Sequence, residues 1–84
     1  MIERGNIYEL TADDMRPKQY VMVIRPESRP GLTMTAMSNR LDFSEINCKT
    51  DVITEHLFDA TFVTKVNKEK VDEVSHTAVR VRRK

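Results

Sequence analysis

The sequence is poor in cysteine, glycine and long apolar runs, and each shortage excludes a class of protein. One cysteine, Cys48, rules out an intramolecular disulfide and a cysteine-based zinc site. The longest apolar run, residues 20–24, is too short to cross a bilayer. With only two glycines, the chain shows no phosphate-binding glycine loop. We therefore expect a cytoplasmic protein without a membrane span, a metal or a cofactor.

Aromatic residues are also scarce, and the net charge is close to zero. The chain has no tryptophan, which limits any surface for stacking on bases, and its formal net charge is +1. The apolar share of 39% and the charged share of 32% are typical of a folded domain with a charged surface. A chain of 84 residues fits one domain with a thin core, and such domains often gain stability as homo-oligomers.

Residues 1–18 are mixed and polar, and we expect an N-terminal extension that lies against a domain of residues 19–84. Residues 7–10 could form a short strand, and Thr11 is a candidate N-cap for a helical turn that ends at Pro17. The adjacent Asp13 and Asp14 are interpreted as helix-start charges, because neighbours in sequence point apart on a helix.

The clearest strand is Gln19–Arg25, which is short and rich in β-branched residues. Its apolar side chains would lie on both faces, with Tyr20, Met22 and Ile24 on one face and Val21 and Val23 on the other. A strand that is apolar on both faces favours a central position in a sheet.

Two helices and two further strands are predicted after it. Leu32, Ala36, Met37 and Leu41 recur at helical spacing, which predicts a helix over Leu32–Leu41. Alternation predicts strands over Glu45–Thr54 and Leu57–Val66, paired as a hairpin. Asn67 looks like the N-cap of a second helix over Lys68–Thr77.

Two further predictions concern the phenylalanines and the end of the chain. Phe58 and Phe62 would belong to the core face of the strand over Leu57–Val66. Residues 79–82 alternate valine with arginine, which favours an edge strand, although Val71, Val74, Ala78 and Val81 also fit one long helix.

The resulting order is strand, helix, strand, strand, helix, strand. This is the βαββαβ order of a ferredoxin-like α+β fold, an antiparallel sheet with two helices on one face. Many unrelated functions share that architecture, so the order alone does not identify an activity.

Residues 20–66 resemble an ACT domain, a small regulatory module. The first strand runs into Ser28-Arg29-Pro30-Gly31-Leu32, which is similar to the Asp-Arg-Pro-Gly-Leu turn of that family. Ile46-Asn47 is similar to its Asn-Ile strand entry, with the two residues in reverse order, and the glycine usual near the helix exit is missing.

The resemblance implies a non-enzymatic, dimeric regulatory module that binds an amino acid or a similar anionic or zwitterionic ligand near this turn. The implied ligand-binding residues are Arg25, Ser28, Arg29, Gly31, Leu32 and Asn47. Independently, free amides at a helix start attract anions, and paired arginines clamp carboxylates. A plain strand-to-helix turn with two solvated arginines explains the same residues.

Two alternative functions stay open. The basic C-terminus could contact nucleic-acid phosphates through Arg80, Arg82, Arg83 and Lys84. The protein would then be a nucleic-acid-binding accessory protein, for example a phage-encoded one that acts on host machinery. A solvated, charged terminus explains the same residues more simply. The chain could also be a structural subunit whose ligand is another protein.

Neither histidine has neighbours in sequence that suggest a metal site or a catalytic pair, so no enzyme is expected.

Overall fold

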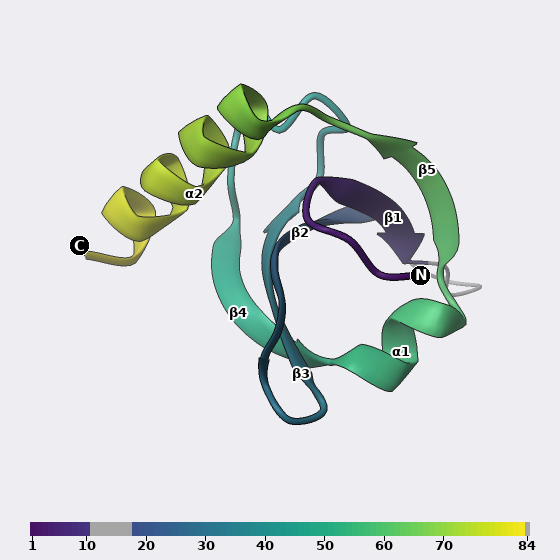
Figure 1. The fold of residues 1–84 in the computed structure, drawn as a ribbon. Helices are drawn as coiled ribbons and strands as arrows, with labels where there is room; N and C mark the ends of the chain where they lie inside the picture. Colours follow the sequence, from purple (N-terminus) through teal and green to yellow (C-terminus); the bar gives the residue numbers. More distant parts are fainter. Residues whose placement is uncertain (11–17, 84) are drawn as a thin grey trace.

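The fold is described from a computed structural model, which covers residues 1–10 and 18–83, with side chains to Thr77 (Figure 1). Five strands and two helices follow one another in the described chain. In order they are β1 (Asn6–Leu10), β2 (Gln19–Arg29), β3 (Leu32–Ser38), β4 (Cys48–Ile53), α1 (Thr54–Phe58), β5 (Thr61–Lys65) and α2 (Lys68–Arg83).

The strands form one antiparallel sheet in the order β4-β3-β2-β1-β5, and the sheet is rolled (Figure 1). The predicted ferredoxin-like βαββαβ order is therefore wrong, although the domain is α+β. No helix lies between β2 and β3. β1 confirms the short strand predicted at residues 7–10, but it is paired between β2 and β5 within the sheet. The predicted turn over Thr11–Pro17 and the pair Asp13-Asp14 lie outside the described residues.

Two apolar clusters fill the two faces of the sheet. Ile7, Met22 and Ile24 pack with Val71 and Val74 of α2 in one cluster. Tyr8, Val21 and Val23 pack with Leu57 of α1 in the other. The helices thus cover opposite faces, not one face as predicted. The prediction of a central β2 that is apolar on both faces is confirmed, since β2 is the middle strand and both of its faces are buried.

The segment predicted as the first helix is a strand. In β3 buried residues lie on both faces of the strand, Thr33 and Thr35 on one face and Ala36 and Ser38 on the other, and all four are fully buried. Their hydroxyls are paired: Thr33 Oγ1 lies 2.8 Å from Thr54 Oγ1, and Thr35 Oγ1 donates to the Thr50 carbonyl at 2.9 Å. The helical prediction rested on the spacing of apolar residues alone, whereas hydrogen bonding lets Thr33 and Thr35 enter the core as well.

We expect the Thr33–Thr54 pair to show a strong coupling energy. Replacing one threonine with valine leaves the other hydroxyl buried without its partner and should cost about 1–3 kcal/mol of unfolding free energy. Replacing both should cost less than the sum of the single changes, because no unpaired hydroxyl remains. Urea unfolding of the four proteins in a double-mutant cycle measures this; purely additive costs would contradict it.

The two later strands are shorter than predicted, and they do not form a hairpin. β4 begins at Cys48, and the predicted strand over Leu57–Val66 loses its first residues to α1. β4 and β5 are the two edges of the described sheet, and β5 pairs with β1. The hairpin was predicted because only Glu55 and His56 separate the two predicted strands, but closeness along the chain does not determine which strands pair.

The second helix is confirmed and is longer than predicted. Asn67 caps it, since its Oδ1 accepts a hydrogen bond from the Lys70 amide at 2.9 Å. Val71 and Val74 are buried against the sheet. α2 then continues to Arg83, so the edge strand preferred for residues 79–82 is wrong and the long helix is right. In Figure 1 this last part runs away from the rolled sheet.

Candidate partner-binding surface

The six predicted ligand-binding residues do not come together. Arg25, Ser28, Arg29, Gly31 and Leu32 lie on the hairpin that joins β2 to β3. Asn47 lies at the other end of β3, where its amide donates to the Met37 carbonyl at 2.8 Å. The seven residues of β3 span about 20 Å. Gly31 has a positive φ of 78° within a hairpin turn, so the expected helix-start amides are absent at that position.

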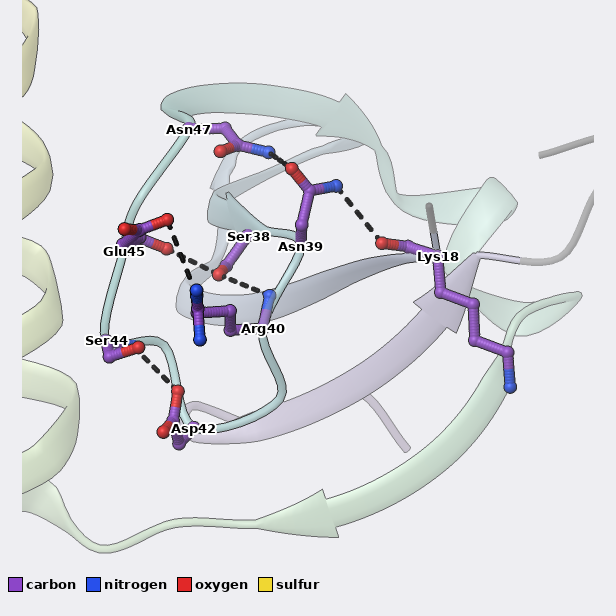
Figure 2. Close-up of polar contacts among 8 residues, drawn as sticks. All are labelled: Lys18, Ser38, Asn39, Arg40, Asp42, Ser44, Glu45 and Asn47. Carbon is purple, nitrogen blue, oxygen red and sulfur yellow. Dashed lines mark hydrogen bonds and ion pairs between the residues drawn. The ribbon is translucent and has the colours of Figure 1, made fainter. Parts of the chain in front are cut away.

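Asn47 instead belongs to the loop that follows β3 (Figure 2). Its side-chain amide donates to Asn39 Oδ1 at 2.9 Å, and the Asn39 amide donates in turn to the Lys18 carbonyl at 3.1 Å. In the same loop, Ser44 donates its amide to Asp42 at 3.0 Å, and this bond lowers the pKa of the Asp42 carboxyl. These contacts hold the loop shape, and they give Asn47 a structural role.

Two phenylalanines predicted to be in the core are on the surface. Phe58 is 65% exposed at the end of α1, and Phe62 is 54% exposed on β5. The neighbouring Leu57 takes the buried position, at 1% exposed. For Phe58 the prediction failed because it extended the strand alternation through α1, where a helical turn directs Leu57 inward and Phe58 outward. Exposed aromatic side chains of this size favour a contact surface.

A hollow of about 760 Å³, here called the Phe58 groove, lies beside this side chain. The hairpin between β2 and β3 contributes Pro26, Glu27 and Gly31 to its lining. The end of β4 and α1 contribute Ile53, Glu55 and Phe58, and the N-terminal residues Met1 and Ile2 complete the apolar part. Of the six predicted ligand residues, only Gly31 lines this groove.

A second hollow of about 500 Å³ continues the apolar surface toward β5. It shares Met1, Ile2 and Phe58 with the Phe58 groove and adds Tyr8 and Phe62. The rings of Tyr8 and Phe62 meet edge to face, with centroids 5.8 Å apart. This contact packs one side of the exposed Phe62 ring against β1.

The charges around the two hollows differ. In the second hollow, Lys65 Nζ lies 2.6 Å from Glu3 Oε1, and this hydrogen bond and charge hold the pKa of Glu3 below its usual range. In the Phe58 groove, Glu27 and Glu55 form no ion pair with any described side chain. The groove is therefore apolar with an acidic rim.

The other candidate groups lie elsewhere. Within residues 1–10 and 18–77, no three metal-ligating side chains converge. His56 and His76 are exposed, and Cys48 is a partly buried free thiol. Arg80, Arg82 and Arg83 lie in the last turns of α2. Their side chains, and the whole of Lys84, are outside the part of the chain that the structure describes.

Comparison with protein-family models, with curated proteins and with solved structures gives no match. The resemblance to ACT domains therefore stays a prediction, and the helix after its Pro-Gly turn is replaced by β3. Across the described part of the chain, none of the helices has the length and apolar character that a bilayer span requires.

Proposed function

We propose that this protein is a non-enzymatic binding module that docks a segment of another protein in the Phe58 groove. The observation that carries the proposal is that Phe58, Ile53 and Met1, three of the exposed apolar side chains, line one hollow. Exposed apolar patches with a polar rim are typical of protein-interaction sites, and aromatic side chains are frequent anchors in them.

The groove fits a protein segment better than the small anionic ligand first expected. Glu27 and Glu55 would repel an anion at its rim, and neither Arg25 nor Arg29 lines it. The Glu27 carboxylate also accepts a hydrogen bond from the Gly31 amide at 3.1 Å, which gives it a role in holding the turn. A cytoplasmic setting and contact with nucleic acid through the end of α2 remain secondary proposals.

Selection of peptides from a displayed random 12-residue library tests this function. We expect enriched peptides that bind the wild-type protein and lose about tenfold or more in affinity with Phe58→Ala, because truncating an aromatic anchor removes its buried contact. His56→Ala is the matched control, since His56 is also exposed on α1 but does not line the groove.

Circular dichroism of both variants should match the wild type, because both side chains are exposed. A selection that enriches no peptide, or only peptides that bind Phe58→Ala as well as wild type, would overturn the proposed function.

A further inference from the structure

The acidic rim of the Phe58 groove is built from two separate elements. Glu27 comes from the hairpin between β2 and β3, and Glu55 comes from the first turn of α1. Both side chains belong to exposed residues that line the groove beside Ile53 and Phe58. Two carboxylates from separate elements thus line the same hollow as these apolar side chains.

Among the residues that the structure describes, no cationic side chain forms an ion pair with this rim. Lys65 is paired with Glu3 in the second hollow, and neither Arg25 nor Arg29 lines the groove. Glu27 and Glu55 have no ion-pair partner among the described side chains. A bound segment therefore meets two carboxylates beside its apolar contact that have no ion-pair partner among the described side chains.

We infer that the partner is a protein segment in which an apolar side chain, seated against Phe58, is flanked by lysine or arginine. This inference rests on the proposed function. Complementary charges at an interface rim steer association and discriminate between partners, while the apolar centre supplies most of the affinity. Segments with aspartate or glutamate beside the apolar residue would be rejected by like-charge repulsion.

Two parallel library selections test the inference, one on the wild type and one on the double variant Glu27→Gln, Glu55→Gln. Glutamine keeps an oxygen that can accept the hydrogen bond from the Gly31 amide, so the turn should be retained. The control is Glu69→Gln, Glu73→Gln, which removes two exposed carboxylates from α2, away from the groove, and changes the net charge equally.

Peptides enriched on the wild type should carry an excess of lysine and arginine beside an apolar residue, and this excess should disappear on the Glu27/Glu55 variant. Their affinity should fall about fivefold on that variant and in high salt, and should stay unchanged on the Glu69/Glu73 control. Peptides that depend on Phe58 but show no basic excess would overturn this inference and leave the proposed function standing. If no selected peptide depends on Phe58, the proposed function itself fails.

Discussion

Replacing Gly5 with alanine should lower the free energy of unfolding by about 3 kcal/mol or more. Gly5 lies where β1 meets both neighbouring strands: its amide donates to the Val23 carbonyl at 2.9 Å, and its own carbonyl accepts from the Val66 amide at 3.0 Å. Its φ of 94° suits only glycine, and an added Cβ would lie 2.6 Å from the Val66 carbonyl oxygen. That oxygen belongs to the backbone, so the clash cannot be relieved by a rotamer change.

Gly31→Ala provides the comparison. Gly31 also has a positive φ, 78°, but an added Cβ would meet no atom within 4 Å. Only the backbone preference is lost, so the expected cost is about 1 kcal/mol. Urea unfolding of both variants measures the difference. Equal costs would mean that β1 is not held between β2 and β5 as described.

Truncation of the neighbouring residues Leu57 and Phe58 should lower the free energy of unfolding by very different amounts. Leu57→Ala should cost about 3 kcal/mol of unfolding free energy, because Leu57 is 1% exposed and packs against Tyr8, Val21 and Val23. Phe58→Ala removes a larger side chain but should cost less than about 1 kcal/mol, because Phe58 is 65% exposed.

Thermal or urea unfolding of the two variants tests this pair directly. A large loss of stability with Phe58→Ala would place Phe58 in the core, as its position in an alternating pattern first predicted, and would remove the apolar surface on which the proposed function depends. A small loss with Leu57→Ala would contradict the packing of α1 on the sheet.

The sequence predicted those elements whose signals are local. β2 was recognised because five consecutive apolar residues at 20–24 can be buried only if both faces of a strand are covered. α2 was recognised because Asn67 caps it and Val71 and Val74 share one face. In both cases the start of the element and its buried residues can be recognised from neighbouring sequence, although both elements extend further than predicted, to Arg29 and Arg83.

The errors over β1, β3 and the candidate site share one physical origin, which is burial that depends on distant partners. Thr33 is buried because Thr54, far along the chain, accepts or donates its hydrogen bond. β1 joins the sheet because β2 and β5 pair with it on either side. The groove beside Phe58 likewise exists only after the β2–β3 hairpin, α1 and the N-terminal residues are assembled.

The most direct test of the binding-module account is to map where a selected peptide contacts the protein by ¹H–¹⁵N chemical-shift changes on titration. The account predicts that the largest changes fall on amides around Glu27, Gly31, Ile53 and Phe58. Changes confined to the loop around Asn47 or to the end of α2, with none beside Phe58, would contradict it.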